Sequence, residues 1–283
     1  MQRRSLRSLS RLGFHELSYL EWNAAAGGVP VVCLHGLTRN ALDFEALGEA
    51  LASAGRWVVA LDVVGRGQSG RLADPDLYGY PQYLCDAAAL IARLDAGEVD
   101  WVGTSMGGLI GMMLAAQPGN PLRRVVINDV GPFVPKAALE RISEYLSTER
   151  RFENLEHAEA HLRKVYEPFG IESPDHWRRF TEISVETDPD GGGLVPAYDQ
   201  EIAAPFRDAH LEDVDLWPVW DAMACSVLLL RGRDSDLLLR ETAEEMLERG
   251  PGCRLVEFPG CGHAPPLLEP AQLDPVVAFL TAA

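Results

Sequence analysis

Ser105 stands in a short pattern that is typical of an activated serine nucleophile. Residues 103–107 read GTSMG, which matches G-x-S-x-G, and they join an apolar run at 99–103 to a helical pattern at 106–117. A strand, a tight turn and a helix in this order form a nucleophile elbow, in which the turn exposes the serine hydroxyl. Glycine at both ends of the pattern leaves room for the strand and the helix to approach each other. The sequence therefore predicts Ser105 as the nucleophile of an acyl-transfer reaction.

A serine hydroxyl is a poor nucleophile at neutral pH and needs a general base beside it. His263 is our candidate, because it lies in the glycine-rich segment GCGHA at 260–264, directly after the last predicted strand. The glycines allow this loop to carry the imidazole over the edge of a sheet. Of the seven histidines, only His263 and His35 have a glycine neighbour just past a predicted strand.

The acid that orients the imidazole is expected between the serine and the histidine in the chain. Two candidates, Asp234 and Asp236, follow the predicted strand at 226–231. We favour Asp236, because the apolar segment LLL directly after it can carry it inward, whereas Asp234 lies between polar neighbours. Asp129, at the end of an earlier predicted strand, stays open as a third candidate.

Acyl transfer places negative charge on a carbonyl oxygen, and two backbone N–H groups are expected to stabilise it. One belongs to the residue after the nucleophile, here Met106. The other is expected in the loop after the strand VVCL, which reads HGLTRN at 35–40, so we assign it to Leu37. We interpret His35 as a histidine that braces this loop and takes no direct part in catalysis.

Predicted strands and helices alternate in the first and in the last part of the chain, and they must position the residues named above. Short apolar runs predict buried strands, and runs with apolar residues three or four positions apart predict helices. The predicted strands are 29–34, 57–62, 99–103, 125–128, 226–231 and 254–258. The predicted helices that alternate with them are 43–53, 83–94, 106–117, 241–249 and 270–280. This alternation predicts the α/β class, with a mostly parallel sheet covered by helices on both faces.

A long helical block interrupts this alternation. From about 131 to 218 no clear strand is visible, and helical patterns occur at 137–146, 155–166 and 176–186. A segment of this length with its own helices is an insertion rather than a loop. We therefore expect a first part of the core at 1–131, an inserted helical cap at 132–218 and a second part of the core at 219–283. Some of the many aromatic residues of the cap are expected to face a cleft that binds an acyl or aromatic group.

Two further patterns have more ordinary explanations than ligand binding. Residues 65–70 read GRGQSG, which matches the dinucleotide pattern G-x-G-x-x-G, but the ADPD that follows breaks the helix that such a site needs. His157 and His161 have the spacing of some metal ligands, yet no third ligand is evident and the surrounding helix is charged. We expect a turn-rich loop and a solvated helix face, and therefore no organic cofactor and no metal.

The composition is that of an ordinary globular protein with a strong acidic excess. Lys and Arg number 25 against 42 Asp and Glu, which gives a formal net charge of −17. Such a surface repels nucleic acids and anionic membranes, so we expect a small-molecule substrate and neither of these partners. No secretory signal or membrane-spanning run is visible, and we interpret the arginines at 3, 4, 7 and 11 as part of a solvated arm. The five cysteines contain no C-x-x-C pair, and we expect all of them to be buried and unpaired in a cytoplasmic, reducing location.

Taken in order, these motifs resemble the α/β-hydrolase fold superfamily. The motifs that carry the resemblance are HGLTRN at 35–40, DVVGRGQS at 62–69, GTSMGG at 103–108, RGRDSD at 231–236 and GCGHAP at 260–265. The resemblance extends from about 29 to the C-terminus, and within the superfamily the chain is similar to bacterial capped esterases and lactonase-like serine hydrolases. It implies an α/β-hydrolase sheet flanked by helices with an inserted cap, a serine–histidine–acid triad, and no cofactor.

The resemblance also bears on the acid and on the nucleophile. Similar proteins carry a Ser-Asp pair before apolar residues, as at 235 and 236, which supports Asp236. Many family members instead place the acid one position earlier, where this chain has Ser235. Epoxide hydrolases and haloalkane dehalogenases carry Asp at the position of Ser105, so their chemistry is not expected here.

Motifs and resemblance together predict a carboxylesterase-like hydrolase that cleaves small to medium, partly apolar esters through an acyl-enzyme. Carbon–carbon bond hydrolases and lactonases use the same triad and stay open as alternatives. Some carbon–carbon hydrolases place Asn before the serine, where this chain has Thr104. A non-catalytic ligand-binding protein is the alternative from another class, because a fold does not fix a function. The sequence leaves the oligomeric state open.

Overall fold

One eight-stranded sheet forms the centre of the computed structural model, which describes residues 1–146, 150–207 and 210–282. The strand order is β1-β2-β4-β3-β5-β6-β11-β12. The strands are β1 (Gln2–Ser10), β2 (Gly13–Trp22), β3 (Val31–Leu34), β4 (Val58–Leu61), β5 (Val99–Thr104), β6 (Leu122–Asn128), β11 (Ser226–Gly232) and β12 (Arg254–Phe258). From β4 to β12 all neighbours are parallel, so the carboxyl ends of these strands meet at one edge. The expected α/β class with a mostly parallel sheet is confirmed.

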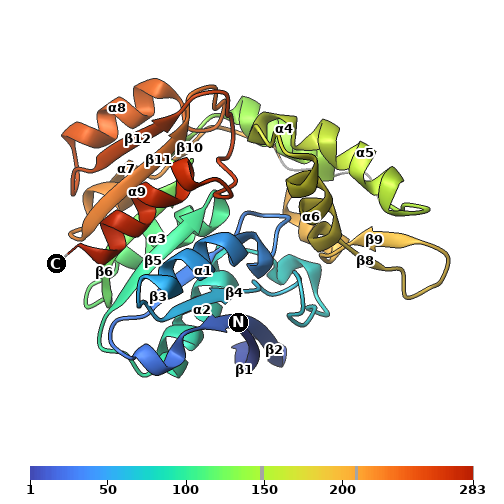
Figure 1. Ribbon diagram of the computed structural model, residues 1–283, viewed down its shortest axis with the longest axis horizontal. Coiled ribbons are helices and arrows are strands. Elements are labelled where there is room, and N and C mark those ends of the chain that lie inside the picture. Colours follow the sequence, from blue (N-terminus) through green and yellow to red (C-terminus); the bar gives the residue numbers. More distant parts are fainter. Residues whose placement is uncertain (147–149, 208–209, 283) are drawn as a thin grey trace.

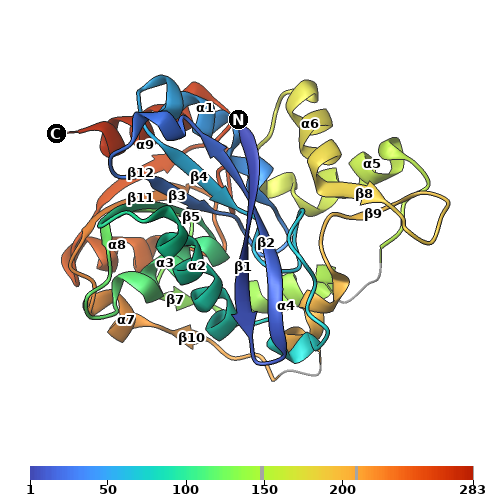
Figure 2. The same cartoon turned by 90° about the horizontal axis from the view of Figure 1, so that it is seen from below.

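Helices cover both faces of this sheet (Figure 1 and Figure 2). Helices α1 (Glu45–Ser53) and α9 (Pro270–Thr281) lie on one face, where they bury apolar side chains with Cys33 and Val102 of the strands. The other face carries α2 (Tyr80–Leu94), α3 (Met106–Ala115) and α8 (Arg240–Glu248). Short 3-10 turns connect some of these elements: η1 (Ala24–Ala26), η2 (Ala41–Phe44) and η3 (Pro75–Leu77). The central strands β3, β4 and β5 are buried on both faces, so they read as nearly continuous apolar runs in the sequence.

The first 22 residues form a hairpin that extends the sheet, so the expectation of a solvated arm is wrong. Strand β1 pairs antiparallel with β2, so that Gln2 lies opposite Glu21 and Ser10 lies opposite Gly13. Strand β2 in turn pairs antiparallel with β4. Two arginines of β1 have acidic partners, since Arg3 pairs with Asp62 at 2.9 Å and Arg4 with Glu21 at 3.2 Å, and Arg11 in the turn after β1 pairs with Asp74. Opposite charges on neighbouring segments thus fix a segment whose own side chains are mostly exposed.

Residues 132–218, which we call the inserted segment, leave the sheet after β6 and return to it at β11. Its elements are β7 (Phe133–Val134), α4 (Lys136–Leu146), α5 (Leu155–Val165), η4 (Glu167–Phe169), α6 (Pro174–Ser184), β8 (Val185–Thr187), β9 (Leu194–Pro196), η5 (Gln200–Phe206), β10 (Val214–Asp215) and α7 (Trp217–Asp221). The expectation of a segment without strands is wrong, because β8 pairs with β9 and β7 with β10. Tyr166, Trp177 and Phe180 pack together in a small apolar cluster of its own.

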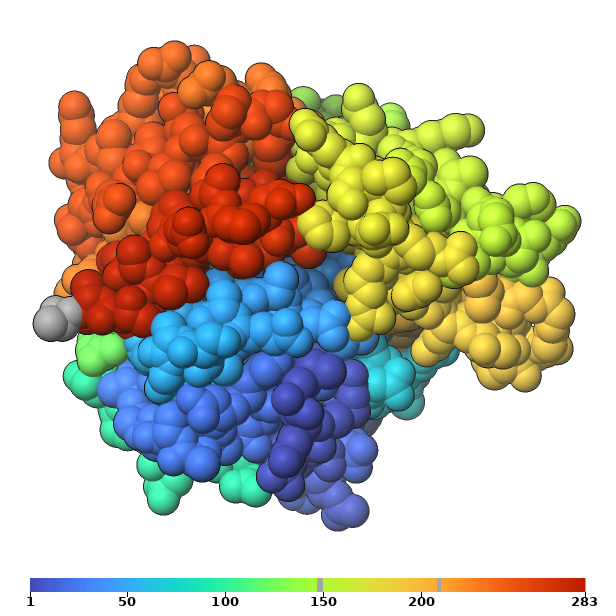
Figure 3. Space-filling model, viewed as in Figure 1, coloured from blue at the N-terminus to red at the C-terminus, as the bar shows by residue number. Residues whose placement is uncertain are grey.

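The inserted segment lies against the carboxyl edge of the sheet and contacts both parts of the core. In the space-filling view its green and yellow residues form a projection beside the blue and red segments of the core (Figure 3). On α6, Arg179 forms an ion pair with Glu45 at 2.8 Å, and His176 lies 3.2 Å from Glu269. The segment is therefore held over the sheet edge from two sides.

The cysteines differ from expectation in one respect. All five are free thiols, but only Cys33 and Cys261 are buried, whereas Cys225 and Cys253 are half-buried and Cys85 on α2 is exposed. The helices of the described residues include none that is both long and apolar enough to cross a membrane.

Helix α3 approaches β5 closely at Gly103 and β3 closely at Gly107. A Cβ on Gly103 would overlap the carbonyl oxygen of Gly107, and a Cβ on Gly107 would overlap the carbonyl oxygen of Leu34. Backbone atoms cannot move aside as a flexible side chain can. The tight strand–helix turn around Ser105 therefore requires glycine at both positions.

We expect Gly103→Ala to destabilise the protein by more than about 3 kcal/mol, because the added methyl group displaces backbone at the elbow. The control is Gly97→Ala, where an added Cβ meets no atom within 4 Å. The unfolding free energy of that variant should stay within about 0.5 kcal/mol of the wild-type value. Urea denaturation measures both values, and an equal effect of the two substitutions would contradict the close approach.

Candidate active site

Ser105 occupies a sharp turn at the carboxyl end of β5. Its backbone has φ 52° and ψ −114°, a region that residues with a side chain rarely adopt. The turn is held by the Ser105 N–H, which donates to the Asn128 carbonyl at 2.9 Å, and by the Ser105 carbonyl, which accepts from Gly108 and Leu109. Strain of this kind is maintained at functional sites, and here it points the hydroxyl away from the strand.

His263 lies between Ser105 and a buried carboxylate. Its Nε2 is 3.0 Å from Ser105 Oγ, and its Nδ1 is 2.8 Å from Asp129 Oδ2. The histidine side chain is 11% exposed and that of Asp129 is fully buried. A carboxylate only accepts hydrogen bonds, so Nδ1 carries the proton and Nε2 is left to accept the serine hydroxyl. This geometry allows His263 to remove a proton from Ser105.

Asp129 follows β6 directly, with φ 58°, and its carboxylate is matched by three donors. Oδ1 accepts the Gly232 N–H at 2.7 Å, and Oδ2 accepts the Ser235 hydroxyl at 2.6 Å in addition to His263. Hydrogen bonds of this kind compensate a carboxylate for the loss of water. Ser235, in the turn after β11, thus donates to a carboxylate that follows another strand, β6.

The expectation that Asp236 contacts His263 is wrong. The Asp236 side chain is about half exposed and forms a bidentate ion pair with Arg141 of α4, at 2.6 and 3.0 Å. Asp234 is also exposed. The carboxylate against His263 is Asp129, which the sequence had left as the third candidate.

The loop after β3 lies beside Ser105, as the motif HGLTRN predicted, and a Cβ on Gly36 would lie 3.8 Å from the Ser105 Cβ. The Gly36 carbonyl accepts from His35 Nδ1 at 2.7 Å and from the Arg39 N–H at 3.2 Å. That carbonyl belongs to the same peptide unit as the Leu37 N–H, so the direction of the Leu37 N–H is fixed. Within the described part of the chain, the N–H groups of Leu37 and Met106 donate to no other protein group.

His35 braces this loop from inside the protein, in agreement with its interpretation as a structural residue. It is fully buried, and its Nε2 accepts the Val63 N–H at 3.0 Å while Nδ1 donates to Gly36. Burial lowers the pKa of His35 to about 3, with the nearby Arg66 and Arg39 charges acting in the same direction. The imidazole is therefore neutral at physiological pH.

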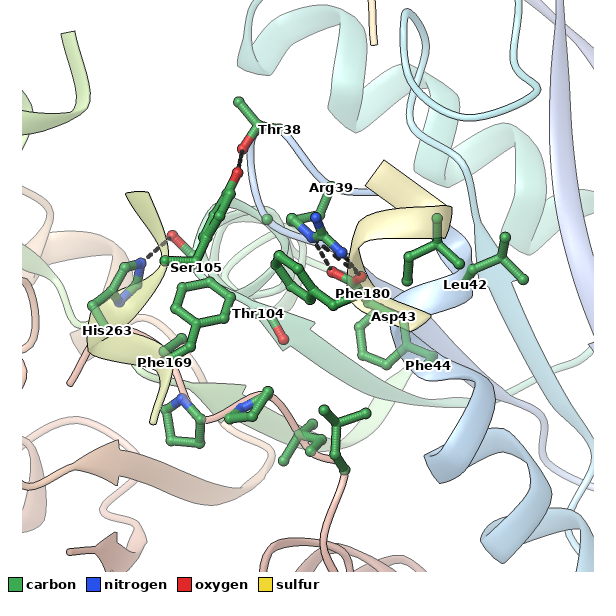
Figure 4. A pocket seen from close by; sticks show the side chains of 18 of the residues that line it. Thr38, Arg39, Leu42, Asp43, Phe44, Thr104, Ser105, Phe169, Phe180 and His263 are labelled. Carbon is green, nitrogen blue, oxygen red and sulfur yellow. Dashed lines mark hydrogen bonds and ion pairs between the residues drawn. The ribbon is translucent and has the colours of Figure 1, made fainter. Parts of the chain in front are cut away.

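Two cavities meet at Ser105. The larger one has a volume of about 300 Å³ and is lined by His263 and by aromatic residues of the inserted segment, among them Phe169 and Phe180 (Figure 4). The smaller one, of about 160 Å³, is almost entirely apolar and is lined by Met106 and by tyrosines of the 78–83 segment. Ser105, Leu37 and Ile142 line both cavities. A bound molecule could therefore extend in two directions from the nucleophile.

The inserted segment also holds the loop at 35–40. Thr38 Oγ1 lies 2.7 Å from the Tyr166 hydroxyl, and Asn40 Nδ2 donates to the Ile183 carbonyl at 2.6 Å. Arg39 is buried, pairs with Asp43 and places its guanidinium 3.7 Å from the ring centre of Phe180 (Figure 4). The contacts with Tyr166, Phe180 and Ile183 join residues more than 100 positions apart, so no local sequence pattern indicates them.

The two patterns that were set aside have ordinary structures. Residues 65–70 form a turn, closed by the Gly65 N–H on the Gly70 carbonyl at 2.8 Å. On α5, His157 lies 3.6 Å from Glu153, and His161 packs on Phe152 with ring centres 5.5 Å apart. Among the described residues, no group of three or more His, Cys, Asp or Glu side chains is arranged to hold a metal ion.

Known proteins resemble this chain over nearly its full length. Residues 31–276 match the model of the alpha/beta hydrolase family. A 3-hydroxybutyrate-oligomer hydrolase of Cupriavidus necator is 43% identical over 282 residues, which cover 97% of this chain and 96% of that protein. A putative hydrolase from Rickettsia typhi has a similar structure, with a TM-score of 0.92, 31% identity and 99% of each chain covered. An alpha/beta hydrolase from Novosphingobium aromaticivorans gives a TM-score of 0.88 and 37% identity, with 99% of this chain and 97% of that one covered.

The depressed pKa of His35 predicts a pH-dependent stability. The folded protein keeps His35 neutral down to about pH 3, whereas the unfolded chain protonates it below about 6.5. The contribution of neutral His35 to the free energy of unfolding is therefore fully present above about pH 6.5. It is lost progressively as the pH falls toward 3, by at most about 1.4 kcal/mol per pH unit. We expect His35→Gln to show a shallower fall of unfolding free energy between about pH 6.5 and 5 than the wild type.

The control is His210→Gln, because the His210 side chain is 86% exposed. The unfolding free energy of this variant should fall with pH as steeply as that of the wild type. Chemical denaturation at a series of pH values measures all three proteins, and a wild-type slope in His35→Gln would contradict the buried neutral state.

Proposed function

Since the chain belongs to the alpha/beta hydrolase family, we propose that it hydrolyses carboxylic esters, with Ser105 as nucleophile, His263 as base and Asp129 as the acid that orients it. The observation that carries this proposal is the hydrogen-bonded line from Ser105 through His263 to the Asp129 carboxylate, at the junction of two cavities. The residues follow the chain order serine, acid, histidine that is typical of this fold.

In the first half of the reaction, Ser105 Oγ attacks the ester carbonyl carbon while His263 Nε2 takes the hydroxyl proton. The carbonyl electron pair moves onto oxygen, and the Leu37 and Met106 N–H groups stabilise that negative charge. Asp129 stabilises the imidazolium that forms, because its carboxylate accepts a hydrogen bond from Nδ1–H and stays ionised.

Collapse of this intermediate breaks the bond to the alcohol oxygen, which receives the proton from His263 Nε2 and leaves. Water then attacks the acyl-enzyme and gives a proton to His263. When the second intermediate collapses, that proton returns to Ser105 Oγ and the carboxylic acid is released. The cycle consumes one water and leaves the enzyme unchanged.

The two cavities determine how the ester lies on Ser105. The leaving oxygen must be within reach of the His263 proton, and His263 lines the larger cavity and not the smaller one. The alcohol part therefore occupies the larger cavity, and the acyl part occupies the smaller, apolar one. A cavity of about 160 Å³ suits a short acyl chain.

Esters of short hydroxy acids fit both cavities. In an oligomer of such acids, the leaving alcohol is itself a hydroxy acid and carries a carboxyl group. The larger cavity is lined by Arg141, Arg179 and His176, and a substrate carboxylate there would share these groups with their present partners Asp236, Glu45 and Glu269. The Cupriavidus necator relative is named a 3-hydroxybutyrate-oligomer hydrolase, which supports the same substrate class.

The inserted segment acts as a cap in this proposal. It supplies the aromatic wall of the larger cavity and holds the loop of Leu37 through Tyr166 and Ile183. Covering Ser105 in this way excludes bulk water and strengthens the electrostatic interactions in the site.

We expect the wild type to hydrolyse a linear 3-hydroxybutyrate dimer and short p-nitrophenyl esters, and Ser105→Ala to lose roughly 10⁴-fold or more in kcat. Release of 3-hydroxybutyrate and of p-nitrophenol measures the two reactions. Rates should fall with acyl length once the smaller cavity is filled. Absence of serine-dependent turnover on every ester would contradict the proposed function.

Asp129→Asn and Asp236→Asn form a matched pair. An asparagine at 129 can present its NH₂ group to Nδ1, which leaves the proton on Nε2, so we expect a loss of about 10⁴-fold in kcat. Asp236→Asn removes only the partner of Arg141 at the wall of the larger cavity, so KM should change more than kcat. Steady-state kinetics on the same esters measures both, and the reverse result would return the acid to Asp236.

A further inference from the structure

Arg66 is a fully buried cation in the turn after β4, within the stretch GRGQSG. Among the described residues, no carboxylate lies within ion-pair distance of its guanidinium. Burying a charge without a counterion is costly, and proteins retain such groups where the charge or its hydrogen bonds serve a purpose.

The guanidinium of Arg66 contacts the backbone carbonyl of Leu37 and the side chain of Met106, the two residues next to Ser105 in space and in the chain. Nε donates to the Leu37 carbonyl at 2.9 Å, and Nη2 lies 4.0 Å from Met106 Sδ. Nη1 donates to the Val64 carbonyl at 2.8 Å and to the Tyr83 hydroxyl at 3.0 Å. The same guanidinium thus contacts both residues whose N–H groups serve as oxyanion donors in the proposed function.

We infer that Arg66 is a positioning residue of the oxyanion site, which fixes Leu37 by its carbonyl and places a permanent positive charge behind the two donors. The inference rests on the proposed function. Leu37 is then held on both sides, because His35 and Arg39 bind the preceding carbonyl of Gly36. Arg66 keeps its proton throughout the reaction and acts only through geometry and charge.

The charge should act mainly when the substrate oxygen becomes negative. A neutral ester carbonyl interacts weakly with a buried cation, whereas an oxyanion interacts strongly in a site from which water is excluded. Arg66 therefore favours the transition state over the bound substrate. A purely structural role would lower stability without separating kcat from KM.

The neighbouring glycines are explained by the same arrangement. A Cβ on Gly65 would lie 2.7 Å from the Tyr78 ring, and the guanidinium carbon lies 5.8 Å from the centre of that ring. Gly65 and Gly67 both have positive φ, 80° and 54°. The pattern G-x-G thus turns the chain so that the residue between the glycines enters the protein beneath Leu37.

The test compares Arg66→Met with Arg56→Met. Arg56 is also a largely buried arginine that donates to a carbonyl, that of Val29, but it lies at the amino end of β4. For Arg66→Met we expect a loss in kcat on the order of 10²-fold with KM within about threefold of wild type. Ser105 is expected to add to an alkyl trifluoromethyl ketone and form a hemiketal oxyanion. The affinity of Arg66→Met for this ketone should fall by a similar factor. Arg56→Met should lose stability and retain wild-type kcat and ketone affinity.

Folded Arg66→Met with wild-type kcat and ketone affinity would overturn the inference, and so would a rise in KM with kcat unchanged. If Arg66→Met does not fold, Arg66→Lys keeps the charge and loses the planar fork, and it should show a smaller loss in kcat at constant KM.

If the wild type hydrolyses no ester but a fluorophosphonate labels Ser105, the proposed substrate class fails instead. The labelling rates of the two Arg66 variants then decide the inference, with a slower reaction supporting it and a wild-type rate overturning it.

Discussion

A carboxylate removed from water must be matched by hydrogen-bond donors, and Asp129 imposes this condition on the carboxyl edge of the sheet. Its donors are the Gly232 N–H, the Ser235 hydroxyl and His263 Nδ1. They come from the end of β11, the turn after it and the loop after β12, which are more than 100 positions away in the chain. His263 can therefore reach Ser105 only when both parts of the core have folded together.

Asn128, the preceding residue, extends this constraint to the nucleophile. Its carbonyl accepts the Ser105 N–H at 2.9 Å, and its side-chain amide donates to Thr104 Oγ1 and to the Pro265 carbonyl. Two consecutive residues at the end of β6 thus fix the serine turn on one side and the histidine loop on the other. A side chain of a different shape at either position would disturb the Ser105–His263 distance without touching a substrate.

The positions of Ser105, of His263 and of the loop of Leu37 at one sheet edge could be predicted because their signals are local. Ser105 and the loop of Leu37 directly follow buried strands, His263 lies in the loop after β12, and all three are marked by glycine in a pattern of a few residues. The carboxylate beside His263 has no such signal, since it depends on which loop at the sheet edge turns toward the histidine. The apolar residues after Asp236 do enter the core, as Leu237 and Leu238 are buried, but they turn Asp236 outward and Ser235 inward. The φ of 58° that turns Asp129 toward His263 is not readable from the sequence.

The β1–β2 hairpin was missed for a related reason. Its first strand exposes most of its side chains, so its sequence lacks the apolar run that identifies a buried strand. What holds it is pairing with β2 and ion pairs such as Arg3–Asp62, which join residues 59 positions apart. Local periodicity cannot report interactions at that separation.

The buried charges on the two sides of Ser105 have opposite signs. Asp129 lies beside the imidazole of His263, which becomes positive in the proposed reaction, and Arg66 contacts Leu37 and Met106, whose N–H groups are the proposed oxyanion donors. In that proposal, the resting protein already contains charges that complement the charge separation of the transition state. Each charge is costly to bury alone, and within residues 1–146, 150–207 and 210–282 neither carboxylate nor guanidinium has an Arg, Lys, Asp or Glu side chain as its counterion. Replacing either by a neutral residue of similar shape should therefore affect the rate of the reaction more than the binding of the ester.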